Sequence, residues 1–358
     1  LTDPWLTDGE YYGSWYHYPP LEYSEGYFDH MDYIYISHIH PDHFSKATFS
    51  KLSRQIPVLI HAYDSKFLKE NIERLGFKVM ELPHNTRTLL KNGVYINILA
   101  ADNCNPELCA RFFGCGMVES KYGSTQIDSL CVIDDGRFVT VNTNDCPYDL
   151  SKASLALVKS QYPQVDFLLT GYGGAGPFPQ CFQMGAGQKA MAAEEKKLQF
   201  LQYGLNYIQE LQPRYVMPFA GTYVLGGRLA ALQEYRGVPE IEDAAEYFSE
   251  RMNAQVVLLN RFDYFDLIEL SPSNPYRATD PEAKRRYIQD VLSVKPLAYE
   301  TVDLNAYMED NMGEIRELIA LAYARFERKR KEIGFSSETI TLVHLEPERW
   351  CSISNQGD

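Results

Sequence analysis

Histidine and long apolar runs are both scarce in this sequence. The chain has 358 residues, of which only 8 are histidines. No apolar stretch approaches the roughly 18 to 20 residues that a membrane-spanning helix needs, which excludes a helical membrane protein. Residues 1–6 lack the charged region and apolar stretch of a secretory signal. We therefore expect a soluble protein, and because position 1 is Leu rather than Met, a longer native chain is left open.

Positive charge and cysteine are also limited. Lys and Arg together number 34 against 48 Asp and Glu, for a net charge of −14. An acidic surface repels phosphates and anionic lipids, so we expect neither nucleic acid nor membrane as a partner. The 7 cysteines form no regular framework, which is typical of a reducing, cytoplasmic environment.

The order of the predicted elements indicates an α/β protein. Strands alternate with helices along the first part of the chain, and regularly spaced leucines predict a helix over 189–212. Two prolines and two serines in 271–275 mark a linker. We therefore expect a catalytic domain over 1–272 and a mainly helical C-terminal appendage over 273–358, with helices at about 281–292 and 305–333 followed by one strand.

Three histidines and one aspartate stand together at the end of the strand predicted over 33–36. They are His38, His40, Asp42 and His43. Alternation along an extended stretch points His38 and His40 the same way, and the turn at Pro41 brings the other two towards a second point. Two imidazoles for one ion, with a carboxylate and an imidazole for its neighbour, is a common layout of a two-metal site.

This His-x-His-x-Asp-His pattern, together with Asp3-Pro4-Trp5-Leu6, resembles the metallo-β-lactamase-fold superfamily. The resemblance implies an αββα sandwich with metals at one end of its two sheets. Further blocks resemble the catalytic portion of the CMP-N-acetylneuraminate hydroxylase family over roughly residues 1–230. These blocks are residues 1–5, 18–20, 142–146, 173–175 with 178–179, and 212–214 with 218–221.

The resemblance implies that Asp145 is the metal-bridging carboxylate, and its place after a strand agrees, although a simple turn before Pro147 is the alternative. Hydrolytic members of the superfamily have a histidine after each of two further strands. This sequence lacks both histidines, near Ala101 and at Phe219. Asp102 is a tentative replacement for the first. His84 is expected to be either an ordinary loop histidine or a further donor, and His61 is expected to pack beside the sheet.

A metal with fewer imidazole ligands keeps open coordination positions. Such a site suits iron and O₂ activation better than a zinc site whose positions are filled by protein ligands. We therefore expect one or two irons in an oxidoreductase of hydroxylase or oxygenase type, acting on a small polar or nucleotide-linked metabolite. Asp42 and Asp145 are its candidate catalytic residues. The alternative is a zinc hydrolase that cleaves a phosphoester or amide, and a third possibility is a non-enzymatic, degenerate member.

Two further expectations concern electrons and substrate. The paired Cys-x-His and Cys-x-x-His motifs of a Rieske cluster are missing, so a separate electron donor is expected. The glycine-rich loop at 171–176 is followed by prolines rather than directly by a helix, which argues against a dinucleotide site. Tyr172, Lys196 and Arg214 are the candidate contacts to an anionic substrate, and a solvated surface is the alternative for Lys196.

Overall fold

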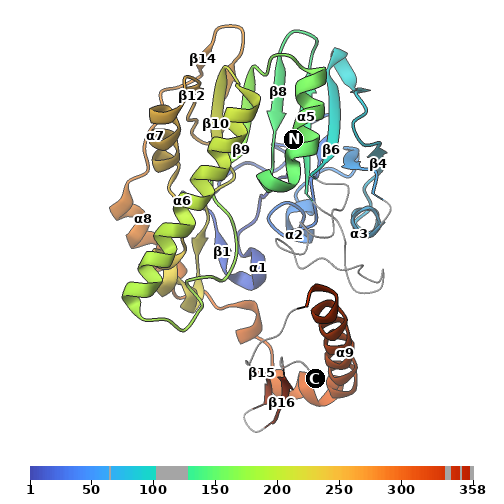
Figure 1. Cartoon of the computed structure of the whole chain (residues 1–358), viewed down its shortest axis with the longest axis vertical. Coiled ribbons are helices and arrows are strands. Elements are labelled where there is room, and N and C mark those ends of the chain that lie inside the picture. Colours follow the sequence, from blue (N-terminus) through green and yellow to red (C-terminus); the bar gives the residue numbers. More distant parts are fainter. Residues whose placement is uncertain (64–65, 102–127, 335–339, 347–348, 355–358) are drawn as a thin grey trace. The chain divides into compact units, whose positions relative to one another are not determined.

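The computed structural model of the chain describes residues 1–63, 66–101, 128–334, 340–346 and 349–354 (Figure 1). It divides into two compact units, Leu1–Leu297 and Ala298–Asp358. The first unit extends beyond residue 272, where the sequence predicted a boundary, because Ile288 and Leu292 pack against Tyr16 and Val224.

A seven-stranded mixed sheet is the centre of the first unit (Figure 1). Its order is β12-β10-β9-β8-β7-β6-β5. The neighbours from β12 to β8 are parallel, and those from β8 to β5 are antiparallel. The strands are β5 (Thr88–Leu89), β6 (Tyr95–Ala100), β7 (Ser129–Asp134), β8 (Val139–Asn142), β9 (Phe167–Gly171), β10 (Tyr215–Phe219) and β12 (Gln255–Val256).

A second, parallel sheet has the order β2-β3-β4. Tyr35, Leu59 and Leu82 from this sheet pack against Ile96, Ile98 and Cys131 of the large sheet, which makes the two sheets inner layers. The bounds are β2 (Ile34–Tyr35), β3 (Val58–His61) and β4 (Val79–Leu82).

Helices cover the outer faces of both sheets. One apolar core joins the large sheet to α5 (Tyr148–Gln161), α6 (Ala186–Leu211) and α7 (Ile241–Arg251). Another joins the small sheet to α2 (Lys46–Phe49) and α3 (Phe67–Arg74). Burial of the apolar face of each helix and sheet accounts for the layering. The predicted αββα sandwich is confirmed.

Short elements complete the first unit. They are α1 (Glu10–Gly13), β1 (Trp15–Tyr16), η1 (Lys91–Gly93), β11 (Val224–Leu225), η2 (Gly227–Tyr235), β13 (Phe265–Asp266), β14 (Ser271–Pro272), α8 (Pro281–Tyr287) and η3 (Ile288–Leu292). β1 pairs with β11, and β13 with β14, both antiparallel.

The second unit contains η4 (Ala298–Glu300), the long helix α9 (Leu304–Ile333) and an antiparallel pair, β15 (Ile340–Glu346) and β16 (Arg349–Ser354). The helix and the first strand match the sequence prediction, whereas β16 was not predicted. No helix among the described residues is both long and apolar enough to cross a membrane.

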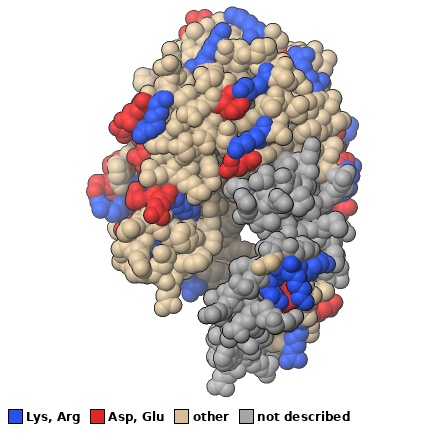
Figure 2. All heavy atoms as spheres, in the orientation of Figure 1, with Lys and Arg blue, Asp and Glu red and all other residues tan. Residues whose placement is uncertain are grey.

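Acidic and basic side chains lie in small mixed groups on the face of the first unit seen in Figure 2. The first unit has exposed ion pairs, such as Lys159 with Glu210 at 2.8 Å. Such pairs contribute little stability, about 0 to 1 kcal/mol each. On the face seen in Figure 2, charges of the two signs are interspersed rather than gathered into one acidic patch.

Candidate metal centre

The histidine loop begins where β2 ends. Residues 1–3 run parallel to β2, with the Tyr35 N–H donating to the Leu1 carbonyl at 2.8 Å. This pairing brings Asp3 beside the loop, where its Oδ1 accepts a hydrogen bond from the Ser37 N–H at 2.7 Å. The Tyr35 hydroxyl, in turn, contacts Ser129 Oγ of the large sheet at 2.7 Å. The loop is thereby fixed to both sheets.

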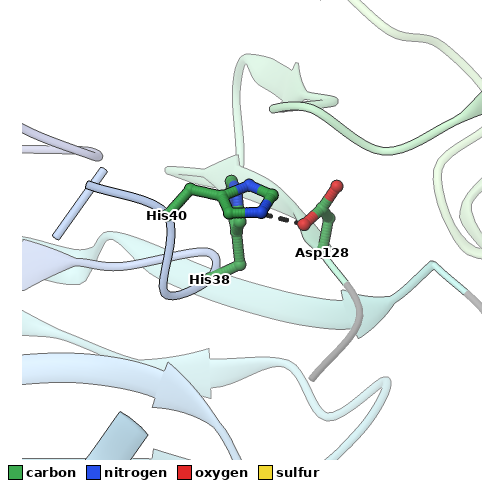
Figure 3. A group of neighbouring side chains, drawn as sticks. All are labelled: His38, His40 and Asp128. Atoms are coloured by element: carbon green, nitrogen blue, oxygen red, sulfur yellow. Dashed lines mark hydrogen bonds and ion pairs between the residues drawn. The ribbon is translucent and has the colours of Figure 1, made fainter. Parts of the chain in front are cut away.

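His38, His40 and Asp128 form one group of converging donors (Figure 3). His38 Nε2 lies 2.7 Å from His40 Nδ1, and His38 Nδ1 lies 3.4 Å from Asp128 Oδ1. The Ser37 hydroxyl is 2.9 Å from the same Nδ1. His38 and Asp128 are buried, whereas His40 is exposed. One face of this group therefore remains accessible to a small molecule.

His43 is the centre of a second group that contains three carboxylates. Its Nε2 lies 3.2 Å from Asp145 Oδ2 and 3.4 Å from Asp42 Oδ2. Its Nδ1 lies 3.1 Å from Asp3 Oδ2. A carboxylate behind an imidazole fixes the orientation of the ring and strengthens the other nitrogen as a ligand. Asp3 has this position, and the Tyr11 hydroxyl fixes Asp42 by donating to its Oδ1 at 2.8 Å.

The loop after β8 is held so that Asp145 faces the histidines. Asn144 adopts a left-handed φ of 46°, a conformation that Asn tolerates better than most residues. Its side-chain amide donates to the Ser129 carbonyl at 2.7 Å. Behind this loop, the Tyr207 hydroxyl of α6 donates to the Cys146 carbonyl at 2.8 Å. The carboxylate position thus depends on both the sheet and a covering helix.

Burial and close charges shift the pKa values across the cluster. Burial, together with the charge of Asp145, raises the pKa of Asp128 to about 8. Burial also lowers the pKa of His38. For His43, burial is outweighed by Asp145 and Asp3, which raise its pKa. For Asp42, burial is likewise outweighed by contacts with His43 and Tyr11, and its pKa falls to about 2.

The donor set fits a metal ion. Among the described residues, two groups have ligand atoms that all lie within 4.8 Å of one another: His38, His40 and Asp128, and His38, His43 and Asp145. Four carboxylates with three imidazoles supply more negative charge than the histidines balance, which favours a bound cation. Imidazole and carboxylate ligands suit zinc or iron.

The structure thus brings together five of the six predicted ligand candidates: His38, His40, Asp42, His43 and Asp145. The sixth, Asp102, lies outside the described residues. Phe219, at the expected position of a missing histidine, pairs with Gly171 where β10 ends.

His61 and His84 lie together at the ends of the neighbouring strands β3 and β4. His61 Nε2 is 3.2 Å from His84 Nδ1, and the Ala100 N–H is within 3.2 Å of that same His84 nitrogen. Burial, together with the neighbouring His84, lowers the pKa of His61 to about 4. The described residues place no third donor within ligand distance of this pair. His61 packs beside the sheet, as the sequence predicted.

The predicted substrate contacts do not form one group. Arg214 precedes β10 and pairs with Asp166 at 3.2 Å. This pair lies at the amino ends of the parallel strands, opposite to the end that holds the metal centre. Tyr172 is fully buried. Lys196 Nζ donates to the carbonyls of Phe178 and Arg236, at 2.7 and 3.2 Å, and burial lowers its pKa to about 8.

The glycine-rich loop has a packing explanation. A Cβ atom at Gly173 would lie 2.3 Å from the Gly221 carbonyl oxygen, and one at Gly174 would lie 2.4 Å from the Phe200 ring. These contacts leave no room for a side chain. The next helix begins only at Ala186, so no helix N-terminus follows directly, as the sequence predicted.

Three residues of the centre were not predicted: Asp128, Asp3 and Tyr11. A signal existed for Asp128, because the hairpin predicted over 129–141 places its first and last residues side by side. Cys131 pairs with Asn142 in the structure, so Asp128 lies across from the loop of Asp145. Asp3 was noted only as part of a motif, and Tyr11 had no local signal.

Comparisons with known proteins find partial similarity at modest identity. No family model matches the chain. It is 26% identical over 230 residues to a Mycobacterium tuberculosis protein described as a Rieske 2Fe-2S iron-sulfur protein, covering 62% of this chain and 40% of that one. It is 27% identical over 232 residues to the cytidine monophosphate-N-acetylneuraminic acid hydroxylase of Asterias rubens, covering 63% and 32%. The chain therefore spans less than half the length of these relatives.

Two solved structures are also similar in part. CmlA, a diiron β-hydroxylase from Streptomyces venezuelae, matches with a TM-score of 0.38 and 14% identity over 63% of this chain and 43% of that one. Isothiocyanate hydrolase from Delia radicum gut bacteria matches with a TM-score of 0.45 and 14% identity, over 71% and 87%.

Topology and motif together decide the fold. Two sheets lie between helical layers, and the His-x-His-x-Asp-His loop follows β2 at the edge where Asp145 follows β8. The chain has the metallo-β-lactamase fold. The two donor groups converge at the end of the two sheets, where the sequence predicted a metal centre.

Proposed function

We propose that the chain is an iron-dependent oxidoreductase of the hydroxylase or oxygenase type, acting on a small polar or nucleotide-linked metabolite. The observation that carries the proposal is the pair of donor groups that share His38, built from imidazole and carboxylate alone. An all-N/O set with open positions is the ligand type of non-haem iron sites. The sequence similarity to the hydroxylase of Asterias rubens supports the same chemistry.

Each residue of the centre has a defined part in this proposal. His38, His40 and Asp128 would hold one iron, and His43, Asp42 and Asp145 would complete the set for a second. Bound iron supplies the redox chemistry with O₂. Asp3 orients His43 from behind, and Tyr11 keeps Asp42 directed towards the centre by donating to its Oδ1. The exposed side of His40 leaves an approach for substrate.

Electrons must reach such a centre from outside the described residues. Among these residues, the free thiols Cys131 and Cys146 are buried, and the exposed one, Cys181, belongs to no metal-ligand group. The proposal therefore includes a separate electron donor, either a reductase or another part of a longer protein. It also includes an anionic substrate, which would bind at open positions on the metal.

The experiment that tests the proposal is elemental analysis of protein prepared without oxygen and without chelators, followed by O₂ uptake with a chemical reductant. We expect one or two irons per chain and uptake that depends on iron. Zinc alone, with hydrolysis of a phosphoester or amide substrate, would establish the hydrolase alternative instead. In that case Asp42 would orient a metal-bound water.

A further inference from the structure

A cavity of about 900 Å³ opens between η2, α7 and α8, within the first unit. It is lined by residues of both charge signs together with small apolar side chains. The lining includes Arg236, Lys284, Glu240, Glu242 and Ala278. The question is whether the charges of this cavity balance one another or leave a group for a ligand.

Three of the four acidic side chains that line the cavity have partners in its wall, and the fourth, Glu234, is exposed. Glu240 accepts two hydrogen bonds from Lys284 Nζ, at 2.7 and 2.6 Å. Glu242 accepts from the Tyr276 hydroxyl at 2.8 Å and from the Thr279 N–H at 3.1 Å. Asp243 accepts from the Glu240 N–H at 3.0 Å. These carboxylates are therefore engaged in holding the cavity wall together.

Arg236 is different, because its guanidinium is buried and largely without acceptors. The residue is 3% exposed, and neither Nε nor Nη1 has a hydrogen-bond partner among the described residues. Among the described residues its ion pair joins Nη2 to Glu240 at 3.5 Å, and Glu240 is already bound by Lys284. Two buried cations thus share one carboxylate. A guanidinium stays charged at neutral pH, and its unsatisfied donors are costly when buried.

An aromatic row connects Arg236 with the metal centre. The guanidinium lies 5.0 Å from the centre of the Tyr223 ring, and Tyr223 stacks on Trp15 at 3.6 Å. Trp15 contacts Tyr11 at 4.3 Å, and the Tyr11 hydroxyl donates to Asp42. A cation over an aromatic face keeps its edge free for acceptors in the guanidinium plane. None of the described ligands of the centre lines the cavity.

We propose that this cavity is an oxyanion-binding site in which Arg236 receives a phosphate or carboxylate group of a ligand. An oxyanion would supply the negative charge that Glu240 cannot give to two cations, and a small rotation of the Arg236 side chain would let the shielded Nε and Nη1 donate to it. Arginine forms stronger hydrogen bonds to such charged acceptors than to neutral ones. The site goes beyond the proposed oxidation, since it requires neither iron nor redox chemistry.

The test is a titration of the full-length His38→Ala, His40→Ala protein with inorganic phosphate and, separately, with acetate, followed by calorimetry. This background weakens the metal centre, so a failure here is distinct from a failure of the iron proposal. We expect saturable binding of at least one anion. Arg236→Met should weaken it by about tenfold or more, and Arg236→Lys by less. The matched control Arg251→Met, at an exposed arginine, should leave it unchanged.

A second variant guards against misfolding after loss of a buried arginine. Ala278→Trp fills the cavity from its exposed rim and keeps Arg236 in place, and it should also weaken binding. Loss of binding in Ala278→Trp together with either Arg236 variant supports the site. No saturable binding of either anion, or binding that survives both Arg236→Met and Ala278→Trp, overturns it.

Discussion

Two groups of histidines lie at the carboxyl ends of the strands of the small sheet, and they differ in the number of carboxylates near them. At the end of β2, His38, His40 and His43 face four carboxylates. At the ends of β3 and β4, His61 and His84 face each other at 3.2 Å without a carboxylate at ligand distance among the described residues. Close histidines alone do not make a metal site. The carboxylates delivered by the large sheet and the N-terminal segment decide which group can hold a cation.

The largest effect is expected from removal of the histidines of the first group. His38→Ala with His40→Ala should lower the metal affinity by more than about 100-fold, beyond the usual loss for an outer partner. Competition with a coloured chelator measures this affinity. The matched variant, His61→Ala with His84→Ala, should keep the metal content of the wild type. Equal losses in the two double variants would contradict the distinction between the groups.

Asp128→Asn tests the carboxylate that the large sheet contributes to the first group. The amide keeps the shape of the side chain and removes its charge, so we expect the metal affinity to fall by about 100-fold. The physical reason is that a buried cation loses a charged ligand. Binding that stays within twofold of the wild type would show that Asp128 is not a ligand.

Asp3→Asn should have a smaller effect, because Asp3 acts through His43. Loss of such an outer partner typically lowers the metal affinity or activity by about 10 to 100-fold. The same chelator competition, followed by activity at saturating metal, separates the two contributions. An unchanged affinity and activity would leave Asp3 with only its hydrogen bond to the Ser37 N–H.

The smallest effect on the metal, but a clear effect on stability, is expected at His61. Its pKa falls from 6.5 to about 4 because of burial and the nearby His84. The neutral ring is favoured in the fold, so its contribution is complete above about pH 6.5 and is lost as the pH falls towards 4. The pKa difference corresponds to about 3 kcal/mol at most.

Urea unfolding at pH 7 and pH 4.5, followed by tryptophan fluorescence, measures that contribution. The stability lost between the two pH values should be smaller in His61→Gln than in the wild type. The same loss in both proteins would show that His61 carries no such linkage. Metal content at pH 7 should not differ between them.

The sequence predicted the centre where its residues are neighbours in the chain. His38, His40, Asp42 and His43 lie in one loop, and their pattern after a strand is specific. Asp145 was predicted from the resemblance, and its place after a strand agreed with that prediction. Asp128 was missed because it precedes a strand, and only the antiparallel pairing of β7 with β8 brings it to the same edge.

The layers of the fold were predictable from the alternation of strands and helices. The residue at which the first unit ends was not. Residues 273–297 follow a segment that reads as a linker, yet Ile288 and Leu292 pack into the first unit. Such packing depends on distant partners such as Tyr16, which local composition does not reveal. For the same reason Arg236 could not be singled out from the sequence. Its unpaired guanidinium nitrogens are recognised only in the folded structure.

X-ray absorption at the iron and zinc edges of anaerobically prepared protein tests the central claim most directly. It measures which metal is bound and which atoms surround it. The account predicts iron with nitrogen and oxygen ligands only, lost in the His38→Ala, His40→Ala variant and kept in the His61→Ala, His84→Ala variant. Zinc alone, or iron surrounded by sulfur, would contradict it.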